Sequence, residues 1–295
     1  MVDIDVSLVR RLILKQFPRW AGLMIKPVEL SGWDNRTFRL GDDMTVRLPS
    51  HEAYEAQVKK EQQWLPKLAS RLPIAIAIPT PLAMGTPSDE YPLHWSIYGW
   101  MDGENATTER IGNLNDFAIE LAQFLNALQQ IDANGGPPPG AHNFYRGGPL
   151  GTYDRETRNA IADLNGMIDT VGAIAVWESA IQTVWNNPPV WVHGDVYPTN
   201  LLVKDGRLSA VIDFGCSGVG DPACDLTIAW TFFFGQSRET FRSHLQLDDE
   251  TWERARGWAL WKALMTISNP SNYPSGRLEE SRRVIQDVIA EHKPR

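Results

Sequence analysis

The pattern of hydrophobic and polar positions changes character near residue 100. Before it, two short apolar runs, 37–40 and 45–48, flank Gly-Asp-Asp and predict a β-hairpin. A helix disturbed at Pro66 is predicted over 51–72. The alternation of isoleucine and alanine within 71–85 favours a strand or extended segment, and 94–104 predicts another strand that runs into a turn.

After residue 100 the apolar positions follow a helical period. The clearest apolar stripe consists of Leu114, Phe117, Leu121, Phe124, Leu125, Leu128 and Ile131. Further helical patterns cover 155–168, 251–267 and 277–290. We therefore predict an α+β fold with two lobes: a small antiparallel-sheet lobe over 1–100 and a mainly helical lobe over 101–295.

One hairpin within the helical lobe brings polar residues together. Asp205-Gly206 is a strong two-residue turn signal, because such turns need positive φ angles. The turn places Asn200 opposite Val211, with Asp213 two residues further along. From the strand rise and spacing, Asn200 and Asp213 should lie roughly 8 Å apart at the open end of the hairpin.

Asp195 precedes the first strand of this hairpin and should lie over the same end. Two carboxylates and an amide make a hard-oxygen site, which favours Mg²⁺ over zinc and points to phosphoryl transfer. A dinuclear hydrolase is a weaker alternative, because it would need more histidine ligands. No metal-ligand spacing is found among the remaining histidines, which are His51, His94, His142, His244 and His292.

Composition excludes several classes of protein. The chain has 295 residues and a net charge of −8, with no basic block that would follow a nucleic acid backbone. Only two cysteines occur, which fits a reducing cytoplasm. We find no signal peptide and no apolar run of about 18 residues, so no membrane segment is expected.

The order of these polar residues resembles a known family. His193-Gly194-Asp195, four residues and Asn200 are followed by Asp213-Phe214-Gly215. This spacing is similar to the kinase catalytic loop and its Asp-Phe-Gly motif. With glycine in the second position, it looks like the aminoglycoside phosphotransferase and choline kinase branch of the protein-kinase-like fold. The stretches SGWDNRTFRLGDDMTVRLP, FYRGGPL and GDPACDL extend the resemblance over most of the chain.

The resemblance implies a role for each motif residue. Asp195 would accept or orient the substrate hydroxyl, supported by His193, while Asn200 and Asp213 would hold Mg²⁺ on the phosphates of ATP or GTP. Asp221 and Asp225 would support the site, although Asp225 also fits an ordinary helix N-terminus. The residues expected to form the nucleotide-binding hinge are Tyr98, Gly99, Trp100 and Met101.

The small lobe carries a second pair of charges. Glu61 interrupts the apolar stripe formed by Tyr54, Val58, Leu65 and Leu68, and a carboxylate on a buried face needs a partner. Arg47 lies where the kinase template has its strand lysine, so we predict an Arg47–Glu61 pair that binds phosphate. Alternatively, Glu61 is half exposed near Pro66. No glycine-rich loop precedes this strand, and only Gly32 and Asn35 are candidates to cover the phosphates.

The acceptor is expected to be a small molecule. Nine residues separate Gly215 from Asp225, too few for a peptide-binding activation segment. An aminoglycoside-type antibiotic is the first expectation; a macrolide, a choline-like alcohol or a sugar are the alternatives. A catalytically silent nucleotide-binding protein should have lost Asp195 or Asp213. We expect a monomer or weak dimer. The aromatic residues expected to line an apolar pocket or pack in the core are Trp230, Phe232, Phe233, Phe234, Trp258 and Trp261.

Overall fold

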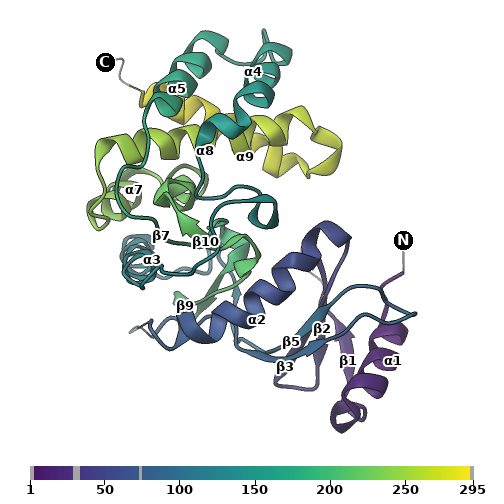
Figure 1. The fold of residues 1–295 in the computed structure, drawn as a ribbon. Helices are drawn as coiled ribbons and strands as arrows, with labels where there is room; N and C mark the ends of the chain where they lie inside the picture. The colour runs from purple at the N-terminus through teal and green to yellow at the C-terminus, as the bar shows by residue number, and fades with distance from the viewer. Residues whose placement is uncertain (1–2, 29–33, 73–74, 293–295) are drawn as a thin grey trace.

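The computed structural model describes residues 3–28, 34–72 and 75–292, which form the two predicted lobes (Figure 1). The N-terminal lobe is built on an antiparallel five-stranded sheet of order β1-β2-β3-β5-β4. Its strands are β1 (Ile25–Pro27), β2 (Asn35–Leu40), β3 (Met44–Pro49), β4 (Pro81–Gly85) and β5 (Trp95–Gly99). The predicted hairpin around Gly-Asp-Asp is confirmed as the β2–β3 pair.

Two helices accompany this sheet. Helix α1 (Val6–Gln16) buries its apolar face against the strands, and α2 (Glu55–Ala69) lies between the sheet and the C-terminal lobe (Figure 1). Helix α2 continues through Pro66 for another turn. Leu65 and Leu68 on either side are each 1% exposed, so their burial offsets the roughly 3 kcal/mol that an interior proline costs.

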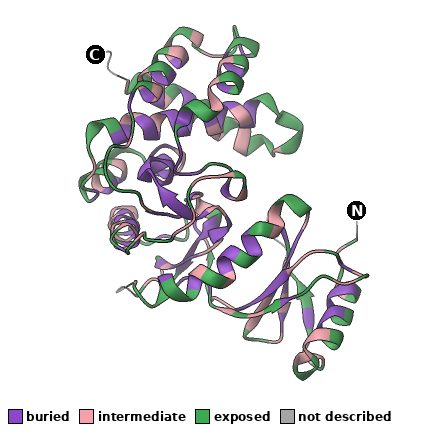
Figure 2. Cartoon of the chain, in the orientation of Figure 1, coloured by how far each residue is buried: buried purple, intermediate pink, exposed green. Residues whose placement is uncertain are grey.

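The C-terminal lobe is mainly helical. The helices predicted near 114–131, 155–168, 251–267 and 277–290 are confirmed, whereas the helices over Thr170–Gln182, Ile228–Thr231 and Gly235–Ser243 were not predicted. Helix α8 runs through the centre of the lobe and is buried along most of its length (Figure 2). No helix in the described ranges is long and apolar enough to span a membrane. The helices are α3 (Leu114–Gln129), α4 (Asp154–Asp163), α5 (Thr170–Gln182), α6 (Ile228–Thr231), α7 (Gly235–Ser243), α8 (Asp249–Ser268) and α9 (Ser275–Ala290).

Two small sheets carry the loops of the predicted site. Strands β7 (Val190–Val192) and β10 (Gly218–Gly220) pair with each other, and β6 (Glu104–Asn105), β8 (Leu201–Lys204) and β9 (Arg207–Val211) form the second sheet. The turn between β8 and β9 is confirmed, because Asp205 and Gly206 have φ angles of 53° and 77°.

The predicted register at the open end of this hairpin is wrong by one residue. The register shifts after Leu202, so that Leu201, not Asn200, lies opposite Val211. The carbonyl oxygen of Ser209, in the shifted part of β9, accepts a hydrogen bond of 3.0 Å from the Ala77 N–H. Asn200 instead pairs with Ile212, whose N–H donates to its carbonyl oxygen at 2.9 Å. Asn200 is therefore one position from Asp213 rather than two.

Candidate active site

The predicted catalytic loop, His193–Asn200, joins β7 to β8 and is attached to the C-terminal lobe by Asp225. Asp225 is fully buried, and its carboxylate accepts hydrogen bonds from the backbone N–H groups of His193 (2.8 Å) and Gly194 (2.7 Å). Gly194 has a φ of +83°, and a Cβ there would lie 2.2 Å from the carbonyl oxygen of Cys216. The loop therefore requires glycine before Asp195.

The His193 ring connects this loop to the strand that leads to Asp213. Its Nδ1 accepts a hydrogen bond from the Asp195 N–H at 3.2 Å, so the proton is on Nε2, which lies 2.9 Å from the Ile212 carbonyl oxygen. The ring therefore links Asp195 to Ile212, next to Asp213, and the supporting role expected for His193 stays a prediction.

Asp221 lies behind the loop. It caps the 3₁₀ helix η7 (Pro222–Thr227) by accepting from the Ala223 N–H at 3.0 Å, and it forms a buried ion pair of 2.6 Å with Arg254 Nε. Asp221 thus fixes the segment that carries Asp225.

The Asp195 carboxylate is held from two sides. Asn200 Nδ2 donates to its Oδ2 at 3.0 Å and to its backbone oxygen at 2.9 Å, and Lys262 Nζ from α8 donates to Oδ1 at 2.8 Å. Burial raises the pKa of Asp195, but Lys262, together with the charges of Arg146 and His193, outweighs burial and holds that pKa well below its usual range. So weakly basic a carboxylate is better suited to orienting a hydroxyl than to removing its proton early.

Asp213 faces the N-terminal lobe and lies in the left-handed region, with φ at +65°. Arg47 Nη2 donates to Asp213 Oδ1 at 2.9 Å, and Arg47 Nη1 lies 3.7 Å from Glu61 Oε1. Glu61 is only 6% exposed, so the half-exposed alternative is wrong. Burial raises the pKa of Glu61, opposed by Arg47, and the Tyr98 hydroxyl donates to its other oxygen.

A third carboxylate, Asp34, faces the same space from the start of β2. Burial, followed by the charges of Asp213 and Asp195, raises the pKa of Asp34 to about 6. Asn35 is buried at the first position of β2, and Gly32 lies outside the described residues. The charges of Asp213 and Asp195 beside Asp34 create a negative potential that a divalent cation would relieve.

The expected magnesium ligands fit this setting. Within the described ranges no group of three or more His, Cys, Asp or Glu side chains is placed to hold a metal. Magnesium keeps several waters and is completed by substrate phosphates, so it needs only one or two protein oxygens. Both side-chain hydrogen bonds of Asn200 use its Nδ2, leaving its amide oxygen outside those bonds, and Asp213 supplies a carboxylate.

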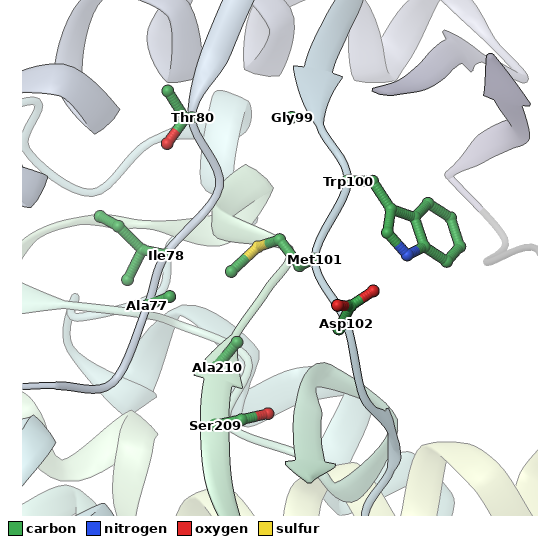
Figure 3. Close-up of a pocket in the computed structure, with 9 residues that line it drawn as sticks. All are labelled: Ala77, Ile78, Thr80, Gly99, Trp100, Met101, Asp102, Ser209 and Ala210. Carbon is green, nitrogen blue, oxygen red and sulfur yellow. The ribbon is translucent and has the colours of Figure 1, made fainter. Parts of the chain in front are cut away.

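A pocket of about 290 Å³ lies where β5 passes into the C-terminal lobe (Figure 3). Three of the four predicted hinge residues, Gly99, Trp100 and Met101, line it, whereas Tyr98 does not, because its side chain is buried against Glu61. The Met101 side chain points toward Ile78 across the pocket (Figure 3). The other lining residues are Ala77, Ile78, Thr80, Asp102, Ser209 and Ala210.

Helix α2 contacts the Asp-Phe-Gly segment directly. Lys60 Nζ, on a residue 8% exposed, donates to the carbonyl oxygens of Gly215 (2.6 Å) and Ser217 (2.8 Å). A Cβ at Gly215 would lie 2.6 Å from Gln57 Oε1 on the same helix. The orientation of α2 and the position of the segment after Asp213 are therefore linked.

Several residues of the candidate site were not predicted from the sequence. Lys262 interrupts the apolar face of α8 just as Glu61 interrupts that of α2, so the same signal was present. Lys60 and Asp34 had no periodic signal, because their neighbours come from distant segments.

The expected aromatic set is mostly core. Trp230, Phe233 and Trp258 are at most 2% exposed, whereas Trp261 is 9% and Phe234 is 55% exposed. The set therefore does not form one continuous apolar pocket.

Comparison with known proteins agrees with this geometry. The sequence profile of the APH phosphotransferase enzyme family matches residues 25–258. A search of curated protein sequences finds no match. Among solved structures, the chain is similar to the GDP and kanamycin complex of APH(2″)-IIia, with 17% identity, a TM-score of 0.74, and coverage of 97% of this chain and 99% of that chain.

Two further structures show the same fold. The streptomycin–ATP complex of APH(2″)-IIa has 18% identity and a TM-score of 0.61, with 97% of this chain and 99% of that chain covered. The macrolide 2′-phosphotransferase MphH from Brachybacterium faecium has 19% identity and a TM-score of 0.64, with 98% and 100% covered. The chain therefore belongs to the APH phosphotransferase enzyme family and has its protein-kinase-like fold.

Proposed function

We propose that this enzyme transfers the γ-phosphate of ATP or GTP to a hydroxyl group of a small molecule, with Asp195 orienting that hydroxyl. The observation that carries the proposal is the placement of Asp195. Its carboxylate is fixed by Asn200 and Lys262 at the hairpin end where Asp213 lies. A positioned carboxylate beside a phosphate and metal site is what phosphoryl transfer to an alcohol requires.

The remaining residues would bind different parts of the nucleotide. The pocket lined by Gly99, Trp100 and Met101 would bind the purine. Arg47, oriented by Glu61, would contact phosphate oxygens with its planar guanidinium. Asn200 and Asp213 would hold Mg²⁺, which neutralises charge on the phosphates when bound.

The ligands named with the related structures indicate which acceptors to test first. Kanamycin, gentamicin and streptomycin are named with APH(2″) enzymes, which makes an aminoglycoside the first acceptor to test. A macrolide is the second candidate, supported by the two macrolide 2′-phosphotransferases. Both classes present hydroxyl groups to the same type of site.

The proposal is tested by incubating the purified chain with Mg²⁺ and either ATP or GTP in the presence of an acceptor panel. We expect an acceptor product heavier by one phosphoryl group, detected by mass spectrometry, and a competition titration to identify the preferred nucleotide. Asp195→Asn is the matched control and should form the product far more slowly, at about 1% of the wild-type rate or less. Absence of binding to both nucleotides would remove the proposed function.

A further inference from the structure

Two cations lie close to Asp195. Lys262 forms the ion pair described above, and Arg146 lies close enough for its charge to lower the pKa of Asp195. The Arg146 guanidinium is stacked against two tryptophan rings of α8, with its Cζ 5.1 Å from the centroid of Trp258 and 4.7 Å from that of Trp261. These contacts fix its position next to the catalytic loop.

Arg146 has no anionic partner among the described residues. It is 9% exposed, and its Nε and Nη1 atoms are buried without a hydrogen-bond acceptor. Arg254, the other buried arginine of the described ranges, is paired with Asp221 at 2.6 Å. A buried guanidinium left unpaired is unfavourable, so its presence here indicates that an anion from outside the chain completes the site.

Besides Asp34 and Asp213, which face the proposed phosphate site, the carboxylates near Asp195 are already engaged. Asp195 is paired with Lys262, and Glu280 accepts hydrogen bonds from Arg277 and Tyr197 at 2.9 and 2.7 Å. Glu156, which is exposed, accepts from the Trp261 indole N–H at 2.6 Å. An amine-rich acceptor would therefore meet Lys262 and Arg146 with little free carboxylate to balance its charge.

We propose that the acceptor subsite beside Asp195 binds a hydroxyl compound that carries an acidic group, which Arg146 and Lys262 recognise. The inference rests on the proposed phosphotransferase function and narrows its acceptor class away from polycationic aminoglycosides. The recognised chemistry is an anionic oxygen group, a carboxylate or a phosphate, held near the hydroxyl that Asp195 orients. The γ-phosphate of the nucleotide carries the same chemistry, so the test must separate the two sources.

A matched series of six-carbon polyols provides the probes: gluconate and sorbitol 6-phosphate are anionic, sorbitol is neutral and glucamine is cationic. Their binding to the chain with saturating Mg-ADP is measured by calorimetry, and ATP and ADP affinities are measured separately. We expect both anionic polyols to bind about tenfold tighter than sorbitol, the gain typical of a hydrogen bond to a charged group. Glucamine should bind most weakly.

The variants assign that preference to Arg146. Arg146→Gln should abolish the difference between gluconate and sorbitol, and Arg146→Lys should keep part of it. Arg242→Gln is the control. Arg242 lies on α7 and also stacks on a tryptophan, with its Cζ 5.0 Å from the ring centroid of Trp252. Thermal unfolding of each variant checks folding, and the Lys variant keeps the test informative if the Gln variant unfolds.

Three results would overturn the inference. The first is equal binding of gluconate, sorbitol and glucamine to the wild-type chain. The second is a charge preference that survives Arg146→Gln, and the third is a loss of ATP affinity without a loss of ADP affinity in that variant, which would assign Arg146 to the γ-phosphate. Failure of the wild-type chain to bind any of ATP, ADP, GTP and GDP would instead remove the proposed function.

Discussion

At Asp195 the two carboxylate oxygens have different partners, Asn200 on one and Lys262 on the other. Asp195→Asn keeps the shape of the side chain and removes its charge. We expect phosphotransfer to fall about 100- to 10,000-fold, as for loss of a positioned catalytic base, while the affinity for Mg-nucleotide stays unchanged. Single-turnover rates and calorimetry measure the two effects, with exposed Asp116→Asn as the control. Activity within a few-fold of wild type would contradict the role.

Asp213 differs from Asp195 because it faces Arg47 and the nucleotide side of the site. Asp213→Asn should weaken nucleotide binding in the presence of Mg²⁺ and reduce the difference between binding with Mg²⁺ and binding with a chelator. Calorimetric titrations of ATP and GTP under both conditions provide the measurement. A variant with the full wild-type response to Mg²⁺ would exclude Asp213 as a metal ligand.

Strand β3 and helix α2 meet through the Arg47–Glu61 pair, which lies 3.7 Å apart in a largely buried setting. Removing Arg47 leaves the buried Glu61 without its cationic partner, and removing Glu61 leaves Arg47 paired only with Asp213. The double variant should therefore lose less unfolding free energy than the sum of the single variants. Arg47→Ala should also lower nucleotide affinity, and Glu61→Ala should lower it less. A double-mutant cycle on both quantities tests this, and strictly additive effects would show that the two residues act independently.

Helix α2 also connects the lobes through Lys60. Burial lowers the pKa of Lys60 to about 8, against about 10.4 in an unfolded chain. Below pH 8 the ammonium donates to the carbonyl groups of Gly215 and Ser217, and above it the charge is lost. We therefore expect kcat to decline above pH 8 and this decline to disappear in Lys60→Met, which starts from a lower kcat.

Deprotonation of Lys60 should change stability in the opposite direction to kcat. Between pH 8 and about 10.4 the folded state binds fewer protons at Lys60 than the unfolded state, so its contribution to the free energy of unfolding rises with pH. A pH series of kcat and of unfolding, with exposed Lys59→Met as the control, separates the two. If kcat and stability fell together above pH 8, Lys60 would not explain the loss of activity.

An element or contact can be predicted when its cause lies in the neighbouring sequence, and cannot when its cause is a contact with a distant segment. The β8–β9 turn was predictable because Asp205-Gly206 is a local signal, but the register shift depends on the contact of Ser209 with Ala77, from another lobe. The pairing of Glu61 was predictable, because a charge interrupts an apolar stripe. Arg146 and Lys60 were not, because no local pattern shows which distant groups surround them.

In the whole molecule, the boundary between the two hydrophobic cores does not follow the division of the chain at residue 100. One core joins α1 to the outer sheet and includes Leu12, Val46 and Trp95. The larger core belongs to the helical lobe but also includes Leu65 of α2 and Ile78. The inner face of α2 therefore packs with the C-terminal lobe, which explains how a helix of the first lobe reaches the Asp-Phe-Gly segment.

The proposed nucleotide pocket crosses this same junction, since Gly99 and Thr80 come from one side of it and Ser209 and Ala210 from the other. A ligand bound to both sides should stabilise the whole chain, by about 2.7 kcal/mol at a concentration one hundred times its Kd. We therefore expect Mg-ATP or Mg-GTP to raise Tm by several degrees in one transition, and to slow hydrogen exchange on both sides of the pocket. Scanning calorimetry and hydrogen-exchange mass spectrometry make the measurement, with Trp100→Ala as the matched variant. If protection were confined to one lobe, the nucleotide would bind to that lobe alone, and the pocket between β5 and β9 would not be its site.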